Sequence, residues 1–396
     1  MNVVLINQFF PPAQAPTGRL LADLASELAR RGHAATVLAS AAGYGAEAAP
    51  GAAPPAGVRV MRVGRGGVHR HGAAEKLRDY AAFYRGVWRE LSQMPRPDAV
   101  VCLTTPPFIG LLGAQLRKTA GVPFALWCMD LYPEALAAHG WLRPWNPLKP
   151  LLGALAREER RRASAVVALG PDMAGRLRAG GAAEVEEIPV WNELAADEAT
   201  CAAARELRRA RGWGDDEIVL LYSGNMGRAH CAEEFAALAE AMQRGSPRGR
   251  FVFAGTGPAR AEWERRWGGQ FEFLPPASKE TCAAHLLAAD VHLISQRAEW
   301  TGVVVPSKFQ AACALGRPVV FVGPPESSVG RWVSAADAGW LLSADAVAAV
   351  AAEIRDPRRR VEKGAAARRL CEREFTRAGN CGRLATLVER IGEKRS

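Results

Sequence analysis

The chain has 396 residues, too many for one ordinary hydrophobic core and enough for two domains of roughly 150–200 residues each. Apolar residues make up 49% and charged residues 23%, which is a globular composition. The net charge of +10 has three competing explanations: the arginine usage of a high-GC genome, attraction to anionic lipid or phosphate-bearing substrates, and nucleic-acid binding, which we disfavour because no nucleic-acid-binding motif accompanies the charge.

The cysteine pattern and the N-terminus predict a cytoplasmic setting. Eight cysteines are scattered without a CxxC motif or zinc spacing, as in a reducing compartment. Residues 1–7 lack the basic region and cleavage pattern of a signal peptide and read as a first strand. The longest apolar stretch, 99–116, is interrupted by Thr104-Thr105-Pro106-Pro107, which predicts a strand, a turn and a helix rather than a membrane span.

The first half of the chain predicts an alternation of strands and helices. An apolar strand at 3–6 leads into a Pro/Gly loop at 10–18, and a leucine-periodic helix then ends at Gly32 before a strand at 36–39. This is a βαβ unit. The further expected elements are a loop at 43–57, strands at 58–63, 98–103, 122–127 and 165–169, and helices at 76–91 and 150–163.

The second half repeats this alternation. Polar, helix-prone residues 194–216 are the expected domain link. The expected elements that follow are strands at 218–222, 251–254, 291–294 and 319–322, with a loop at 224–232 and a helix at 233–242. We therefore expect two doubly wound α/β domains facing a cleft, with ligands at the carboxyl ends of the strands.

Two glycine-rich turns follow strands in the second half. In Ser223-Gly224-Asn225-Met226-Gly227-Arg228, the glycines permit close backbone approach and Arg228 supplies a planar cation suited to phosphate. The alternative is a tight turn with a solvent-exposed arginine. Gly255-Thr256-Gly257-Pro258 is the second such turn. Neither is a Walker A motif, and the loop at 11–18 is not GxGxxG, so no dinucleotide cofactor is expected.

Lys308 stands in the first turn of an expected helix, after Pro306 and the predicted N-cap Ser307. A cation there is unfavourable for the helix dipole. We expect Lys308 to face a bound anion, against the alternative of a lysine whose charge lies in water.

Acidic and histidine residues in the first half are weaker candidates. Asp130 and Glu134 follow the strand that ends near Trp127, so they lie where ligands bind, although Asp130 could simply cap a turn before Pro133. The histidines, for which we expect structural roles or no metal partner, are His33, His69, His71 and His139.

Together these segments resemble bacterial family-4 glycosyltransferases, in the branch of O-antigen and capsule enzymes that includes fucosamine transferases. The similar segments are NQFFPPAQAPTGRL, MDLYPE, IPVWNE, LYSGNMGRAH, FAGTGP, AADVHLIS and VVVPSKFQAACALGRPVV. The resemblance implies a GT-B fold. We expect an acceptor-binding domain over 1–195, a nucleotide-sugar-binding domain over 196–375, and a helix over 376–396 that packs back on the first domain.

The resemblance also implies residue roles. Arg228 and Lys308 would hold the diphosphate and Asp130 would lie near the reacting sugar, and these three are the expected catalytic residues. Residues expected to line the phosphate loop, border the nucleoside or contact the donor are Gly18, Gly224, Asn225, Gly255, Gly257, Ser307 and Glu326.

One departure from the family concerns a pair of glutamates that many members carry about eight residues apart. Here those places fall near Val303 and Ala311, neither acidic. Glu299 and Glu326 flank the segment and are candidates to replace them. The donor sugar therefore stays open.

We expect a retaining, metal-independent hexosyl- or N-acetylhexosaminyl-transferase that uses a nucleotide-diphosphate sugar, with UDP favoured, and no further cofactor. The expected acceptor is a glycan or lipid-linked molecule of cell-surface polysaccharide synthesis. Basic-aromatic stretches 65–91 and 141–162 could contact the anionic inner face of the plasma membrane or pack on the sheet as ordinary helices. The alternatives are a non-hydrolysing sugar-nucleotide epimerase and an inactive nucleotide-sugar-binding module.

Overall fold

The computed structural model describes residues 1–13, 15–41, 54–65 and 72–393. Most of the expected loop at 43–57, together with His69 and His71, therefore lies outside the described residues. The chain divides into two compact units. Unit 1 consists of Met1–Val190, Gly302–Val304 and Ala378–Ser396, and unit 2 consists of Trp191–Thr301 and Val305–Arg377.

Unit 1 is built on a seven-stranded parallel sheet of order β3-β2-β1-β4-β5-β6-β7. Its strands are β1 Asn2–Ile6, β2 Ala34–Ser40, β3 Val58–Val63, β4 Ala99–Leu103, β5 Phe124–Trp127, β6 Ala165–Ala168 and β7 Val185–Glu187. Its helices are α1 Pro16–Arg30, α2 Ala73–Gln93, α3 Gly110–Ala120, α4 Glu134–Ala138, α5 Leu148–Arg162, α6 Pro171–Ala179 and α15 Arg377–Glu393. The strand order reverses between β1 and β4, which is a topological switch point.

Unit 2 is built on a six-stranded parallel sheet of order β10-β9-β8-β11-β12-β13. Its strands are β8 Glu217–Ser223, β9 Arg248–Ala254, β10 Phe271–Leu274, β11 Val291–Ser295, β12 Val319–Val322 and β13 Gly339–Leu341. Its helices are α7 Glu198–Arg211, α8 Glu233–Gln243, α9 Arg260–Trp267, α10 Cys282–Leu287, the 3₁₀ turn η1 Ala298–Trp300, α11 Lys308–Ala314, α12 Ser328–Ala336, α13 Val347–Arg355 and α14 Pro357–Glu374. The switch point here lies between β8 and β11.

The predicted α/β class with two doubly wound parallel sheets is confirmed. Strands β4, β5, β6 and β11 are buried at every position, because helices cover both faces of a parallel sheet. Their residues are apolar except His292 and Ser295 of β11. One local prediction was wrong. Helix α1 begins at Pro16, a residue favoured at the first helical position, so Gly18 lies in the helix rather than in the preceding loop.

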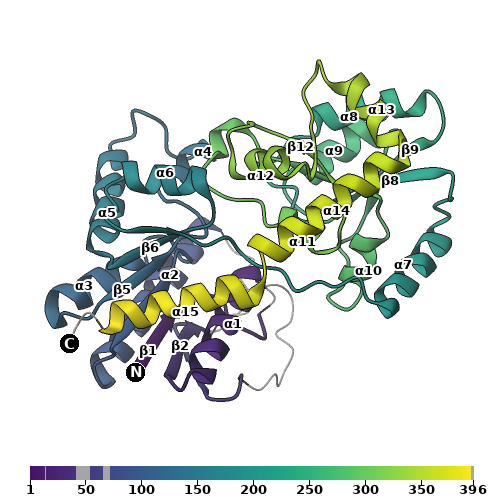
Figure 1. The fold of residues 1–396 in the computed structure, drawn as a ribbon. Helices are drawn as coiled ribbons and strands as arrows, with labels where there is room; N and C mark the ends of the chain where they lie inside the picture. The colour runs from purple at the N-terminus through teal and green to yellow at the C-terminus, as the bar shows by residue number, and fades with distance from the viewer. Residues whose placement is uncertain (14, 42–53, 66–71, 394–396) are drawn as a thin grey trace. The chain divides into compact units, whose positions relative to one another are not determined.

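Two segments belong to a different unit from the residues next to them in the sequence. Helix α15 joins unit 1 and runs beside α1, where Glu389 pairs with Arg31 at 2.9 Å and accepts from His33 at 2.8 Å (Figure 1). His33 is therefore part of a structural contact. Residues Gly302–Val304 also belong to unit 1, where the Leu131 amide donates to the Val303 carbonyl at 3.0 Å.

The expected link at 194–216 is mostly helix α7 of unit 2. The Asp197 side chain caps this helix by accepting from the Thr200 amide at 2.8 Å. Ala204 and Trp213 are buried in the core of unit 2. A polar helix packed on one face explains why this segment looks like a linker in sequence.

Candidate active site

The two glycine turns of unit 2 lie side by side at the carboxyl ends of β8 and β9. The Gly224 amide donates to the Ala254 carbonyl at 2.8 Å, and the Met226 amide donates to the Thr256 carbonyl at 2.7 Å. Parallel pairing of β8 with β9 sets this register, since Ser223 lies opposite Ala254. The turns therefore form one hydrogen-bonded platform next to the switch point, where ligands bind in sheets of this kind.

Glycine is required at three positions of this platform. Gly224, Gly255 and Gly257 have φ angles of 125°, 146° and 141°, which side chains disfavour. A Cβ on Gly255 would lie 2.0 Å from the Gly224 carbonyl oxygen, and one on Gly257 would lie 2.5 Å from the Met226 carbonyl oxygen. A Cβ on Gly224 would lie 2.9 Å from the Lys308 Cε. The glycines thus let two backbones and one lysine stem occupy the same small space.

Lys308 begins helix α11 and extends its ammonium to this platform. Its Nζ donates to the Tyr222 hydroxyl at 2.6 Å and to the Asn225 carbonyl at 3.3 Å. The Tyr222 hydroxyl in turn donates to the Asn225 carbonyl at 2.8 Å, so its oxygen is the acceptor for Lys308. Within the described residues no carboxylate pairs with Lys308. Burial without a counter-charge lowers the pKa of Lys308 to about 7.

His230 is the third neutral neighbour of Lys308. Its Nδ1 lies 2.6 Å from the Ser295 carbonyl, which can only accept, so Nδ1 carries the proton. Its Nε2 then faces the Lys308 Nζ at 3.5 Å as an acceptor. Burial and the nearby ammonium lower the pKa of His230 to about 3, so the ring is neutral at physiological pH. The lysine is surrounded by neutral groups, which leaves its charge to be matched by a ligand.

The sequence interpretation missed Tyr222 and His230. Tyr222 sits inside an apolar strand, where a tyrosine is commonly a core residue, and His230 follows the glycine turn without a partner nearby in sequence. Their role becomes visible only when β8, β11 and α11 bring them to the same ammonium. The available signal was the position of both residues in the segment that also carries Gly224 and Arg228.

The other cations and caps expected in unit 2 lie at its surface. Arg228 is exposed on the turn after Gly227. Ser307 is exposed and directly precedes α11, but its side chain makes no capping hydrogen bond because its own backbone is already helical, with φ −65° and ψ −10°. The predicted N-cap position of Ser307 is confirmed, but its side chain does not cap the helix.

The two candidate replacement glutamates are separate from the platform contacts. Glu326 is exposed between β12 and α12, and Glu299 is exposed in η1. In the described part of the chain, no hydrogen bond or ion pair joins either carboxylate to Lys308 or to the glycine turns. These contacts therefore do not assign Glu326 or Glu299 to the donor site.

In unit 1, Asp130 lies just after β5, at the carboxyl edge of the sheet. The Thr104 hydroxyl, which follows β4, accepts from the amides of Met129 at 2.9 Å and Asp130 at 3.1 Å and holds this turn. Burial raises the pKa of Asp130 to about 6. A carboxyl group of this pKa can exchange a proton near neutral pH.

Glu134 and Gly18 have structural explanations within unit 1. Glu134 receives two hydrogen bonds of 3.0 Å from the buried guanidinium of Arg160, which also donates to the Tyr132 carbonyl. This bidentate pair neutralises a buried charge. A Cβ on Gly18 would lie 3.2 Å from the Phe10 backbone, so glycine lets α1 pack against the preceding loop.

One group of side chains is a candidate for a metal site. Among the described residues, Cys231, Glu233 and Glu234 form one group whose potential ligand atoms lie within 4.8 Å of one another. Burial raises the pKa of the Cys231 thiol to about 12, which disfavours the thiolate that metals bind. These residues carry no metal assignment.

Comparison with known proteins finds similarity to glycosyltransferases. Residues 17–191 match the family model described as "Glycosyl transferase 4-like domain". Over 243 residues, 60% of each chain, the sequence is 25% identical to the "Putative colanic acid biosynthesis glycosyl transferase WcaI" of Escherichia coli (strain K12). The aligned part thus spans less than two thirds of that relative.

Solved structures resemble the whole chain. Sucrose-phosphate synthase from Thermosynechococcus elongatus is 16% identical, with a TM-score of 0.76 and full coverage of both chains. Anabaena HepE, solved in complex with UDP, is 15% identical, with a TM-score of 0.67 over 98% of this chain and 100% of its own. These matches confirm the predicted GT-B fold.

Proposed function

We propose that this protein is a glycosyltransferase that moves a sugar from a nucleotide-diphosphate donor to a hydroxyl acceptor. The observation that carries this proposal is the Lys308 ammonium, held by neutral partners beside the glycine turn that follows β8. A buried cation without a counter-ion favours an anionic ligand, and backbone free of side chains admits a phosphate closely. The match of residues 17–191 to a glycosyltransferase family supports the same activity.

In the proposed reaction, unit 2 holds the donor. Lys308 and the exposed Arg228 contact the diphosphate, with Gly224, Asn225 and Ser307 along the phosphates and Gly255 and Gly257 beside the nucleoside. The bond from the anomeric carbon to the phosphate oxygen breaks and its electron pair stays on the leaving diphosphate. The acceptor oxygen bonds to that carbon from the same face, and its proton passes to the leaving phosphate, so configuration is retained. The two cations stabilise the charge that develops on the diphosphate.

Unit 1 is the proposed acceptor side. Asp130 is placed near the reacting sugar because its carboxyl group follows a strand end and titrates near neutral pH. Gly18 would let the first loop of this unit approach the donor. Donor recognition by Glu326 or Glu299 rests on their flanking positions alone.

The substrates are proposed from the relatives. HepE has been solved with UDP and with UDP-glucose, which favours a UDP-sugar donor of the hexosyl or N-acetylhexosaminyl class. The name of the E. coli relative refers to colanic acid biosynthesis, which favours a glycan or lipid-linked acceptor in cell-surface polysaccharide synthesis. The fucosamine-transferase branch remains part of this proposal through the sequence resemblance.

The direct test incubates the protein with UDP-, GDP- and dTDP-sugars, with lipid-linked acceptors, and measures nucleotide release and epimer formation. Lys308→Ala and Arg228→Ala should each lower turnover by about 10²–10³. Lys279→Ala, which removes an exposed lysine elsewhere in unit 2, is the control and should leave turnover unchanged. Normal turnover in both platform variants would contradict the assignment.

The same assay separates the alternatives. Epimer formation would favour a sugar-nucleotide epimerase, and binding without turnover would favour an inactive module. We propose that Arg228 and Lys308 take the place of a divalent metal and that no further cofactor is needed. Activity lost with EDTA and restored with Mg²⁺ would overturn that part.

We further propose that unit 1 contacts an anionic membrane surface through residues 141–151. Trp141 and Trp145 are 63% and 76% exposed, and Leu148 and Leu151 beside them are also exposed. Exposed Arg143 and Lys149 lie in the same stretch. Apolar and basic side chains together are typical of membrane-surface segments. None of the described helices combines the length and apolarity needed to span a bilayer.

The stretch 65–91 is left out of this contact. Phe83 and Val87 on α2 are buried and the Tyr84 hydroxyl donates to the Pro107 carbonyl, so one face of this helix packs on unit 1, although Leu77 and Trp88 are exposed. Flotation with anionic and neutral liposomes tests the proposal. Trp145→Ser should reduce binding to anionic liposomes several-fold, whereas Val361→Ser on α14, an exposed apolar residue of unit 2, should not. Equal flotation with both lipid types would contradict the proposal.

A further inference from the structure

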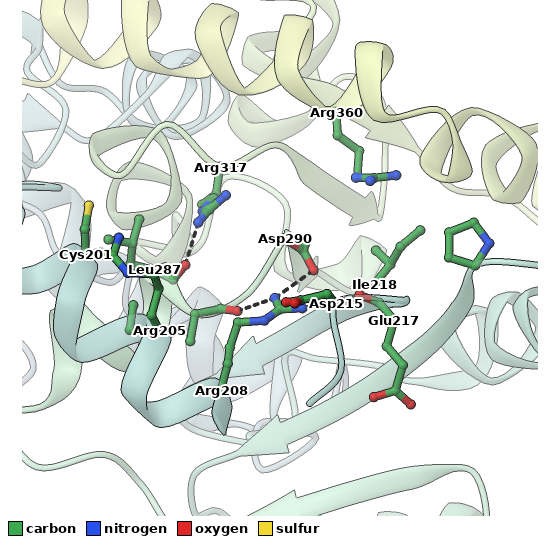
Figure 2. Close-up of a pocket in the computed structure, with 13 residues that line it drawn as sticks. Cys201, Arg205, Arg208, Asp215, Glu217, Ile218, Leu287, Asp290, Arg317 and Arg360 are labelled. Carbon is green, nitrogen blue, oxygen red and sulfur yellow. Dashed lines mark hydrogen bonds and ion pairs between the residues drawn. The ribbon is translucent and has the colours of Figure 1, made fainter. Parts of the chain in front are cut away.

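Unit 2 has a cavity at the opposite edge of its sheet, at the amino ends of the strands. Its volume is about 380 Å³, and it lies among the start of β8, the residues before β11 and β12, and helices α7 and α14 (Figure 2). We call this cavity the arginine pocket, because it is lined by four arginines, Arg205, Arg208, Arg317 and Arg360. These arginines come from three separate segments of the chain, so no local sequence pattern predicts that they lie together.

The charges in the arginine pocket do not balance. Three carboxylates also line it, but Glu217 is held by Arg250 through two contacts of 2.9 Å. Asp290 pairs with Arg208 at 3.0 Å, and Asp215 is exposed. Among the described residues, Arg205, Arg317 and Arg360 have no carboxylate within ion-pair distance. The pocket therefore concentrates more positive than negative charge.

Arg317 shows the imbalance most clearly. Its Nη2 donates to the Leu287 carbonyl at 2.6 Å, whereas its Nε is buried and has no hydrogen-bond partner. A buried guanidinium N–H without an acceptor is costly. Burial lowers the pKa of Arg317, and the nearby Arg208 lowers it further against the opposing effect of Asp290.

Arg360 completes the arrangement from the other wall. It extends from α14 toward the space above Asp290, while Arg208 approaches from α7 on the opposite side (Figure 2). Its Nη1 donates to the Ile354 carbonyl, and burial lowers its pKa. Asp290 is thus the ion-pair partner of Arg208, and its charge also acts on Arg317 and Arg360.

We propose that the arginine pocket binds a small phosphorylated molecule through its phosphate or diphosphate group. Guanidinium groups bind phosphate oxygens through paired hydrogen bonds, and a cavity of this size accommodates a small metabolite. The phosphate oxygens would accept from the guanidinium groups of Arg317 and Arg360 and supply their counter-charge. The ligand would bridge α7, the strand ends and α14, and so stabilise unit 2.

This site is separate from the proposed donor site. The arginine pocket includes Glu217, at the first position of β8, whereas the glycine platform follows its last residue, Ser223. Seven residues of strand extend about 20 Å, so one small ligand cannot occupy both places. Binding at the arginine pocket is therefore independent of the proposed transferase activity.

The test measures binding of inorganic pyrophosphate by calorimetry to the full chain carrying Arg228→Ala and Lys308→Ala, which disables the proposed donor site. We expect one pyrophosphate per chain and a rise in melting temperature. Adding Arg360→Gln or Arg317→Gln should weaken binding by about tenfold or more. Arg205→Gln, at an exposed position of the wall, should weaken it less.

The matched control is Arg359→Gln, which removes a neighbouring arginine of α14 that pairs with Glu362 at 3.4 Å. It should leave pyrophosphate binding unchanged. Circular dichroism checks that each variant is folded, and Arg205→Gln keeps the proposal testable if Arg317→Gln unfolds. Three results would overturn the proposal. The first is no pyrophosphate binding to the Arg228→Ala, Lys308→Ala background. The second is affinity in the Arg205, Arg317 and Arg360 variants equal to that of the background, and the third is a loss of affinity in Arg359→Gln as large as in those variants.

Discussion

The carboxyl edges of the two sheets differ in the sign of the ionisable group that each one holds. In unit 2, the Lys308 ammonium lies on a platform of glycine backbone and has only neutral partners. In unit 1, the corresponding edge holds the Asp130 carboxyl on a turn fixed by Thr104. Burial lowers the pKa of the lysine to about 7 and raises that of the aspartate to about 6.

The difference shows how two domains of the same fold can carry side chains suited to two different ligands. A cation among backbone groups is prepared for a phosphate, whereas a carboxyl group with a raised pKa is prepared for a hydroxyl and its proton. The buried Arg160 of unit 1 is neutralised by Glu134. Each of the following predictions tests one side of this contrast.

The largest effect is expected from Gly255→Ala. The new Cβ would lie 2.0 Å from the Gly224 carbonyl oxygen at a φ of 146°, so the two turns would have to separate. We expect nucleotide binding to be lost and the free energy of unfolding to fall by more than about 2 kcal/mol. Urea denaturation and UDP titration measure these effects. Gly269→Ala, which has open space around it, is the control, and equal behaviour of both variants would refute the platform.

A smaller effect is expected from Asp130→Asn. Turnover should fall by roughly 10²-fold while nucleotide affinity is unchanged. Since the folded pKa is raised, the wild-type protein loses stability as pH increases through the interval from about 4 to about 6, and the asparagine variant should not. The variant should therefore be at least as stable as wild type at pH 7. Reduced stability with full activity would show that Asp130 is structural.

Lys308 should make nucleotide binding pH-dependent. Because its pKa in the free protein is about 7, a diphosphate must draw a proton onto it above neutrality. Affinity for UDP should fall by about tenfold from pH 7 to pH 8.5, with net proton uptake in calorimetry buffers of different ionisation enthalpy.

Lys308→Met should abolish this pH dependence, and Lys279→Met should retain it. Stability of the ligand-free protein has the opposite trend: it should rise from pH 7 to pH 10, since the unfolded chain then binds the proton that folded Lys308 has lost. A pH-independent affinity in the wild type would argue against contact between Lys308 and the diphosphate.

The smallest effect is expected from Tyr222→Phe. The hydroxyl accepts from Lys308 and donates to the Asn225 carbonyl, so its loss should cost about 1 kcal/mol of stability and weaken UDP binding a few-fold. Tyr80→Phe, a change of the same kind on α2 of unit 1, should not alter UDP binding. If Tyr222→Phe leaves the affinity for UDP unchanged, the role of Tyr222 is limited to packing.

Much of this molecule follows from local sequence patterns. Apolar runs of four to seven residues, each followed by a helical period, predict parallel strands because helices must cover both faces of the sheet. The glycines at 224, 255 and 257 and the lysine after Pro306-Ser307 are visible as motifs. Their grouping is expected because carboxyl ends of parallel strands share an edge.

Other features depend on pairs distant in sequence. Glu134 looks like a site residue until Arg160 is found beside it. Lys308 and Tyr222, which are 86 residues apart in the chain, meet only in the folded unit, as do the walls of the arginine pocket. Residues Gly302–Val304 return to unit 1 although they immediately precede the Lys308 segment.

The sequence by itself therefore determined the class of fold, the two glycine turns and the positions of most strands, because these follow from periodicity and backbone geometry. The short edge strands β7, β10 and β13 were not predicted. Only the tertiary structure decided which charges are neutralised and which are left for a ligand. That distinction depends on burial and on partners supplied by other strands and helices, and these set the electrostatic free energy of a charge far more than its own sequence neighbours do.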